Sequence, residues 1–267
     1  MVNAVYSKLS SKSMLSYCTL SGVDASNAAE TATEIGHLAN NHITHKISQI
    51  NTHSYTLPSE TSQYTQLHHL AVQHGKNLWQ SESGPLNLGG TYLGFDNNLL
   101  MGDVIIRDMR YLKPTAWCQW QYMTPNTQWG FIKNHANATF ERGINFYMFS
   151  QFSRFIKRDY TVLHSNGAST LAAINTTNDT VVLVINNSSA SNTSYTIDLS
   201  LFGSTGTNAK VYRTRSGFSG THRRVSGYGA NGNYKVGTHQ TIGSLTNGTY
   251  TAKAWVRSTG SLTSAYF

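Results

Sequence analysis

The sequence is poor in acidic residues. It has 12 Asp and Glu residues in 267, against 20 Lys and Arg, which gives a formal net charge of +8. The basic residues are mostly scattered, and the tightest groups are Arg213, Arg215, Arg223 and Arg224, and Lys157 with Arg158. Nucleic-acid sites usually concentrate basic charge on one face, so this diffuse excess argues against a nucleic-acid partner.

Cysteines and long apolar runs are also scarce. Cys18 and Cys118 lie 100 positions apart and lack metal-ligand spacing, so a disulfide stays open but two separate buried thiols are expected. No stretch approaches the ~18 apolar residues of a membrane span, which argues against a membrane protein. Residues 1–9 lack the basic start and apolar core of a signal peptide.

The sequence has many histidines, but they are not spaced as the ligands of a metal site would be. The first third of the chain is rich in histidine, namely His37, His42, His45, His68, His69 and His74. These residues lie in predicted helices and turns without acidic partners at ligand spacing, so neither a metal nor another cofactor is expected. Only 12% of residues are charged, while Asn, Ser, Thr, Gly and Tyr are abundant. That composition suits an extracellular, β-rich protein that handles carbohydrate.

The first part of the chain, to about residue 157, alternates between helix and strand patterns. Helices are expected at residues 1–9, 28–40, 62–73, 102–112 and 144–156. Strands are expected at 16–20, 47–50, just before Glu82 and at 116–122, with loops at 22–27 and 51–55. This alternation predicts βα units around a parallel sheet or barrel.

The pattern changes after Lys157. Short β-type runs separated by Asn, Asp, Gly and Ser predict an antiparallel β-sandwich over residues 158–225. From residue 226 to 267 the chain holds about three further strands, with a hairpin signal at Asn247-Gly248. Three strands are too few for an independent sandwich.

Unusual side chains gather at three consecutive predicted strands. His53 and Tyr55 follow the first strand, Glu82 follows the second, and the third strand itself holds Trp117, Trp120, Gln121 and Tyr122. In a β/α barrel, the ends of consecutive strands meet on the catalytic face. A carboxylate lined by aromatic rings suits a sugar, whose C–H faces stack on rings. A phenol beside a carboxylate can orient it and keep it ionised, as a nucleophile requires.

Each of these residues also has a plainer interpretation. Trp117 and Trp120 could be core residues, and His53 could be a hydrogen-bonded loop histidine. A single Glu at the end of a strand is more often a surface residue than a nucleophile. The conjunction of the three strand ends favours a functional site over these alternatives.

Several motifs, in order along the chain, carry a family resemblance. They are residues 51–55 (Asn-Thr-His-Ser-Tyr), 78–84 (Leu-Trp-Gln-Ser-Glu-Ser-Gly), 107–117, Trp120-Gln121 and 147–157. With them, the chain resembles the C-terminal part of a glycoside hydrolase of family 30. The endo-β-1,6-galactanase-like members are the most similar in motif.

The resemblance implies the fold: an α/β plus all-β chain. Residues 1–157 would form strands five to eight of a (β/α)₈ TIM barrel, residues 158–225 a β-sandwich, and residues 226–267 an incomplete β-type carbohydrate-binding module. It also implies a secreted protein that acts on a polysaccharide or oligosaccharide.

The resemblance further implies a retaining mechanism with two carboxylates. Glu82 matches the family's nucleophile, and Tyr55 matches the tyrosine that forms a hydrogen bond with that nucleophile. Trp120 matches a sugar-platform tryptophan, and the other substrate-binding residues implied around it are His53, Trp79, Trp117 and Gln121.

One part of the family pattern is missing from the sequence. The general acid/base is the Glu of an Asn-Glu-Pro-type motif after the fourth barrel strand, and no such motif occurs here. Asp24, Glu34 and Glu60 lie in other elements and are poor substitutes. We therefore expect little or no activity from this chain alone, and either a partner that supplies the other half-barrel or self-association through open sheet edges. The alternatives are a non-catalytic carbohydrate-binding protein and an inactive truncated fragment.

Overall fold

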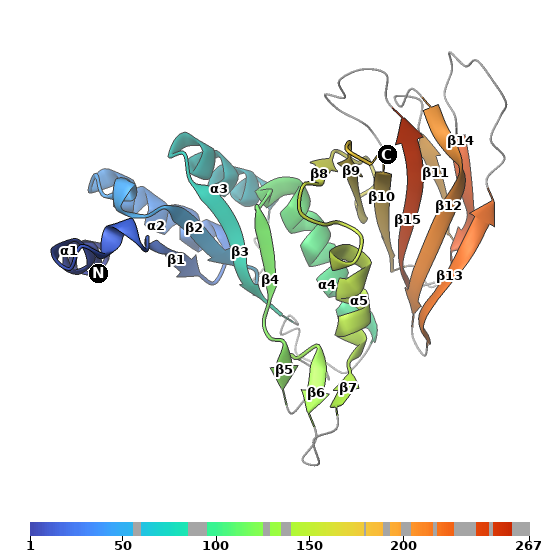
Figure 1. Cartoon of the computed structure of the whole chain (residues 1–267), viewed down its shortest axis with the longest axis horizontal. Coiled ribbons are helices and arrows are strands. Elements are labelled where there is room, and N and C mark those ends of the chain that lie inside the picture. The colour runs from blue at the N-terminus through green and yellow to red at the C-terminus, as the bar shows by residue number, and fades with distance from the viewer. Residues whose placement is uncertain are drawn as a thin grey trace. The chain divides into compact units, whose positions relative to one another are not determined.

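The computed structural model of the chain describes residues 1–55, 60–84, 95–124, 129–134, 140–178, 180–188, 193–198, 204–215, 218–226, 239–245 and 248–257. The chain forms two compact units (Figure 1). The first holds Met1–Gly90 and Arg107–Tyr122, and the second holds Thr91–Ile106 and Met123–Phe267. These units do not coincide with the expected boundaries at residues 157 and 225, and the division into functional domains stays a prediction.

The first unit is built on a four-stranded parallel sheet in the order β1-β2-β3-β4. Its strands are β1 (Ser21–Ala25), β2 (Gln49–His53), β3 (Asn77–Ser83) and β4 (Ala116–Gln119). Its helices are α1 (Val2–Ser11), η1 (Met14–Ser16), α2 (Ala28–Asn40), η2 (Thr44–Lys46), α3 (Thr61–Gln73) and the π-helix η3 (Asp108–Leu112). Parallel strands in chain order, joined through helices, are the repeating βα unit of a barrel. The predicted α/β character of this part is confirmed.

Helices α2 and α3 pack on one face of the sheet. Asn27 caps α2, since its side chain accepts from the Glu30 N–H at 3.0 Å and donates to the Glu30 carboxylate at 2.9 Å. The core on this face comes from Ala28, Ala32, Ile35, Ile47, Ile50, Tyr64, Leu67, Ala71, Leu78 and Leu112. A buried hydrogen bond of 2.8 Å between the hydroxyls of Thr31 and Thr52 ties α2 to β2.

The first strand lies later in the chain than expected. Residues 16–20 were expected to be a strand, and this is wrong, because η1 ends at Ser16 and β1 covers Ser21–Ala25. Residues 22–27 were expected to be a loop, since Gly22 and Asp24 weaken the local strand signal. Pairing with β2 overrides that weak propensity, as is usual for strands.

Two further expected elements have different ends. The helix expected at 102–112 is longer, because α4 (Phe95–Arg107) begins seven residues earlier and its continuation, η3, is a π-helix. The strand expected at 116–122 ends at Gln119, so Trp120 and Gln121 follow β4 and do not belong to it.

The second unit contains a six-stranded antiparallel sheet in the order β13-β12-β15-β10-β9-β8. Its strands are β8 (Thr161–Leu163), β9 (Thr170–Asn175), β10 (Thr180–Asn187), β12 (Ser204–Arg215), β13 (Phe218–Ser226) and β15 (Gly248–Arg257). A two-stranded sheet pairs β11 (Thr193–Asp198) with β14 (His239–Leu245). Every residue of β10 is buried, as the apolar run from Val181 to Ile185 predicts for a central strand.

Strand β15 lies between β10 and β12, so residues 248–257 share a sheet with strands of the 158–225 segment. The segment 226–267 was expected to begin a separate module. In the observed sheet order β15 pairs with β10 and β12, and the assignment of residues 226–267 to a module of their own stays a prediction.

The second unit also holds α4, α5 (Ile144–Ser153) and a small sheet of β5 (Met123–Thr124), β6 (Ile132–Asn134) and β7 (Phe140–Arg142). The amide of Asn186 in β10 donates to the carbonyl oxygen of Leu99 in α4 at 2.7 Å. A β-carbon on Gly102 would lie 2.9 Å from the Asn186 Oδ1, so this close approach requires glycine. In the described ranges, no helix has the length and apolarity needed to cross a membrane.

Both cysteines lie in the first unit. Cys18 and Cys118 are free and half-buried. The expectation of two separate thiols is confirmed, although neither is fully buried. Burial raises the pKa of the Cys118 thiol above its ordinary value.

Candidate active site

Glu82 occupies the penultimate position of β3, at the carboxyl end of the parallel sheet. Tyr55 follows β2, the neighbouring strand, and its phenol forms a side-chain hydrogen bond with Glu82. Burial, this hydrogen bond and the charge of Glu82 together raise the pKa of Tyr55 above its ordinary value. The phenol therefore keeps its proton and donates a hydrogen bond to the Glu82 carboxylate.

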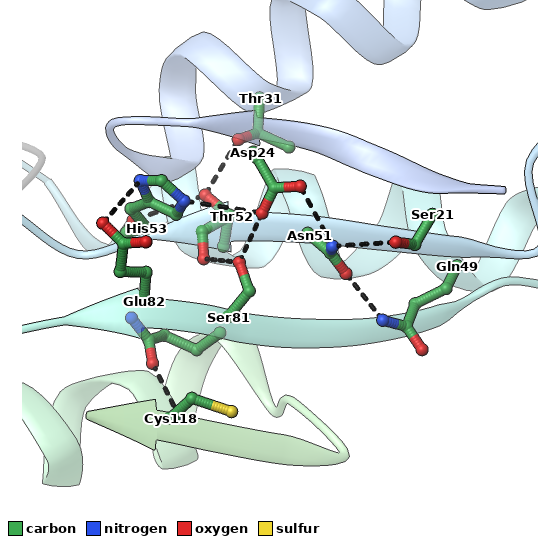
Figure 2. Close-up of polar contacts among 11 residues, drawn as sticks. Ser21, Asp24, Thr31, Gln49, Asn51, Thr52, His53, Ser81, Glu82 and Cys118 are labelled. Atoms are coloured by element: carbon green, nitrogen blue, oxygen red, sulfur yellow. Dashed lines mark hydrogen bonds and ion pairs between the residues drawn. The ribbon is translucent and has the colours of Figure 1, made fainter. Parts of the chain in front are cut away.

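His53 is the last residue of β2 and lies between two carboxylates (Figure 2). Its Nδ1 is 4.0 Å from the Glu82 Oε1, and its Nε2 is 3.4 Å from the Asp24 Oδ1. The ring also meets the Tyr55 ring edge to face, with centroids 5.8 Å apart and planes at 89°. The structure thus brings Glu82, Tyr55 and His53 together at the carboxyl end of the sheet, and their roles stay a prediction.

Asp24 is a member of this cluster that sequence reasoning missed. It was considered only as a poor substitute for the acid/base, within an expected loop. In the structure its Oδ1 accepts from the Ser81 hydroxyl at 2.7 Å and its Oδ2 accepts from the Asn51 amide at 3.1 Å. The one sequence signal that could have pointed to Asp24 was the rarity of acidic residues, since the chain has only 12. The hydrogen-bond partners of Asp24 depend on strand pairing that the sequence does not show.

Trp79 lies on the sheet face opposite α2 and α3. Neighbouring residues of a strand point to opposite faces, and Leu78 belongs to the core beneath those helices. Trp79 pairs in register with Asn51 and is 37% exposed. It therefore shares a face with Asn51 and the polar cluster, where an accessible ring can take part in binding.

Trp117 meets a different environment. It pairs in register with Gln80, whose side chain is fully buried, and its indole N–H donates to the Asp108 Oδ2 at 2.8 Å. Asp108 is itself fully buried and also accepts from the Ser54 hydroxyl at 2.9 Å. The indole N–H of Trp117 is thus already used in a hydrogen bond within the protein. No role was predicted for Asp108, although it lies in the motif at residues 107–117.

Asp108 titrates unusually because of where it lies. Burial raises its pKa to about 7, although the hydrogen bonds from Trp117 and Ser54 and the charge of Arg107 act in the opposite direction. Its other oxygen, Oδ1, has no hydrogen-bond partner among the described residues. A neutral carboxylic acid tolerates such a site better than a carboxylate does.

Trp120 and Gln121 continue directly from β4. The backbone N–H of Trp120 donates to the Ser83 carbonyl oxygen at 2.6 Å, which holds this segment beside the end of β3. The Trp120 side chain is 46% exposed, whereas Gln121 is half-buried. Across the described parts of the chain, no three His, Cys, Asp or Glu side chains gather as a metal site would require.

No family model matches the chain. It is similar to an endo-β-1,6-galactanase of Hypocrea rufa, with 28% identity over 182 residues. The match covers 66% of this chain and 36% of that protein, so the chain spans about a third of the length of its curated relative.

Two solved structures share the fold. The catalytic domain of a family 30 xylanase C from Talaromyces cellulolyticus matches with a TM-score of 0.64 and 17% identity, over 96% of this chain and 56% of that one. An arabinose-bound α-L-arabinofuranosidase of family 51 matches with a TM-score of 0.56 and 13% identity, over 90% of this chain and 46% of that one. The predicted resemblance of the chain to glycoside hydrolases of the family 30 type is confirmed.

Proposed function

We propose that this chain carries the nucleophile of a retaining glycoside hydrolase that acts on a β-linked polysaccharide. The observation that carries the proposal is the hydrogen bond between Tyr55 and Glu82 at the carboxyl end of a parallel sheet. Strands β1 to β4 would be barrel strands five to eight, whose carboxyl ends form the catalytic face. The similarity to a β-1,6-galactanase makes β-1,6-galactan the first substrate to test.

The reaction has two steps. A Glu82 oxygen attacks the anomeric carbon, and a bond to that carbon forms as the bond to the leaving oxygen breaks. The leaving oxygen takes a proton from a second carboxylic acid. Water, deprotonated by the same group, then displaces Glu82. Tyr55 would hold the attacking carboxylate in place, and Trp120 would stack the sugar with Trp79, Trp117, His53 and Gln121 around it.

We propose that the acid/base is not among the residues of this sequence. The second carboxyl group of a retaining enzyme lies about 5 Å from the nucleophile. Asp24 has His53 between itself and Glu82 and is held by Asn51 and Ser81. Without the acid, bond cleavage depends on how well the leaving group departs unprotonated.

Leaving-group dependence tests this proposal. The purified chain should release dinitrophenol from a 2,4-dinitrophenyl β-galactoside, because that leaving group needs no protonation, and should release nothing from β-1,6-galactan. Glu82→Gln should abolish the release, and Glu34→Gln, on the exposed part of α2, should not. Release that survives Glu82→Gln would overturn the assignment of the nucleophile, and galactan hydrolysis by the chain alone would overturn the missing acid.

A second candidate function is carbohydrate binding without catalysis. The exposure of Trp79 and Trp120 favours it, because accessible rings are what a sugar face stacks on. In that case the chain would bind galactan without hydrolysing any glycoside. Binding measured by calorimetry would survive Glu82→Ala and be lost in Trp120→Ala.

We also propose that the six-stranded sheet and the β11–β14 sheet form the β-sandwich that accompanies such barrels. A cavity of about 420 Å³ lined by β9, β10 and β11, including Leu183, Ile185 and Ile197, supports two facing layers. The protein would act outside the cell, where polysaccharide is available.

A further inference from the structure

The geometry points to Asp24 as a positioning residue that orients the His53 ring against Glu82. This inference rests on the proposed role of Glu82 as the nucleophile and adds a residue to the same site. Asp24 would not touch the substrate. It would act through His53, whose two ring nitrogens face Asp24 on one side and Glu82 on the other (Figure 2).

Two β-bulges bring Asp24 into the cluster. The pairing of β1 with β2 shifts between Val23 and Ala25, so Asp24 is the extra residue, and its φ is 63°. Asp adopts this left-handed conformation more readily than most residues. The pairing of β2 with β3 shifts where Thr52 faces Gln80 and His53 faces Glu82, so Ser81 is the extra residue there. Bulges often redirect side chains next to active sites.

The two extra residues, Ser81 and Asp24, form a hydrogen bond with each other across the intervening strand. Ser81 on β3 donates to Asp24 on β1 at 2.7 Å, and β2 lies between these strands. Asn51 on β2 donates to the other oxygen of Asp24 at 3.1 Å and is itself anchored, since it accepts from the Gln49 amide at 2.7 Å. Both oxygens of Asp24 thus accept hydrogen bonds, one from β2 and one from β3, and these fix the position of the carboxylate.

The fixed carboxylate determines which way the His53 ring presents its protons. Asp24 accepts only, so the nitrogen facing it, Nε2, must carry a proton for a favourable contact. The other nitrogen, Nδ1, then faces Glu82 at 4.0 Å. Without Asp24, Glu82 would be the carboxylate that faces the ring among the described residues, and the preferred proton of a neutral ring would be the one on Nδ1.

An exposed pair elsewhere in the chain shows how an incidental contact looks. His37 lies 3.6 Å from Glu34 on the surface of α2, with side chains 64% and 52% exposed, and such surface pairs contribute little. Asp24 is also accessible, at 44%, but the His53 side chain is only 18% exposed and lies within 4.0 Å of two carboxylates from different strands. Glu34 therefore provides the matched control for Asp24.

Two-bond ¹H–¹⁵N spectra of the full chain test the inference directly, because they show which ring nitrogen carries the proton. A His53→Gln variant identifies the His53 signals. In the neutral ring, we expect the proton on Nε2 in the wild type and a shift to Nδ1 in Asp24→Ala. Asp24→Asn, which keeps the size of the side chain, should shift the same balance. Glu34→Gln should leave the His53 signals unchanged.

The same variants are then labelled with a 2-deoxy-2-fluoro-β-galactosyl fluoride, which brings its own leaving group and leaves the sugar on the nucleophile. The maximal labelling rate should fall about 10-fold or more in Asp24→Ala, because a small displacement of reacting groups is costly in rate, with the half-saturating concentration unchanged. An unchanged His53 tautomer in Asp24→Ala would overturn the inference, whether or not labelling slows. A wild type that is not labelled would instead refute the proposed function, while the tautomer comparison would still decide whether Asp24 orients His53.

Discussion

Glu82 owes its surroundings to two residues at the end of the neighbouring strand. Tyr55 donates a hydrogen bond to its carboxylate, and the His53 ring lies 4.0 Å away, so the acid is held by β2 although it belongs to β3. Tyr55 can donate only while it keeps its proton, and the raised pKa of the phenol ensures this over the whole physiological range.

Tyr55→Phe should slow covalent labelling of Glu82 by about 10- to 100-fold. A hydrogen bond to a charged group contributes roughly 1.5–3 kcal/mol, and each 1.36 kcal/mol is about tenfold in rate. The labelling rate at saturation measures the effect, since the phenyl ring keeps its packing against His53. Tyr17→Phe, at an exposed position before β1, is the control and should label like the wild type. Equal rates in Tyr55→Phe would show that the phenol does not orient Glu82.

Asp108 should make stability depend on pH near neutrality. Its pKa is about 7 in the folded chain and 3.8 ordinarily, so the folded state binds the proton more tightly. The stabilising contribution of the protonated Asp108 is therefore fully present below about pH 4 and is lost as the pH rises through about 7. The free energy of unfolding should fall over this range by on the order of a few kcal/mol. Urea unfolding of the wild type and Asp108→Asn from pH 4 to 8 measures the difference.

The wild type should lose stability relative to Asp108→Asn as the pH rises, because only Asp108 has to be buried as an ion. Other titrating groups cancel in this comparison, as both chains carry them. Parallel curves for the two proteins would contradict the buried, neutral Asp108.

At the level of elements, local signals determine how well each could be predicted. Helix α2 was predicted with its observed ends, because Asn27 caps it and its apolar residues recur at helical spacing. Strand β1 was misplaced, because Gly22 and Asp24 do not look like strand residues until β2 pairs with them. The same bulge hid the contact between Asp24 and His53.

The residues of the candidate site differ in how far the sequence could place them. Glu82 lies at the end of β3 and Tyr55 follows β2, and both belong to recognisable motifs, so the sequence was enough to expect them at the same edge of the sheet. The position of Trp117 depends on Asp108, which comes from η3 and meets Ser54 beyond β2. That meeting is a consequence of tertiary packing, and no spacing in the sequence predicts it.

Two glycines in helices give a matched test of packing. Gly102→Ala in α4 should destabilise the second unit by about 1–3 kcal/mol, because the added methyl group meets the Asn186 amide at 2.9 Å. Gly36→Ala in α2 meets nothing within 4 Å and should stabilise the chain by about 0.5–1 kcal/mol through helix propensity. Thermal unfolding compares the two. A Gly102→Ala chain as stable as Gly36→Ala would refute the close approach of α4 and β10.

At the level of the whole molecule, the parallel sheet ends in two edges. Within the described ranges, β1 pairs with β2 alone and β4 with β3 alone. Unpaired edges present free backbone groups to other chains. A barrel closes by pairing such edges, which four strands in chain order do not do by themselves.

The isolated chain should therefore self-associate as its concentration rises. Sedimentation velocity at a series of concentrations measures this, and co-expression of a complementary half-barrel should suppress it by covering the edges. A monodisperse monomer that melts in one cooperative transition would contradict the expectation of exposed edges.

The central claim is that Glu82 is a glycosidase nucleophile. The most direct measurement is peptide mapping by mass spectrometry after labelling the chain with the 2-fluoro galactosyl fluoride. We predict one sugar per chain, attached to the peptide that contains Glu82 and absent in Glu82→Gln. A sugar attached to another residue, or equal labelling of Glu82→Gln, would contradict the claim.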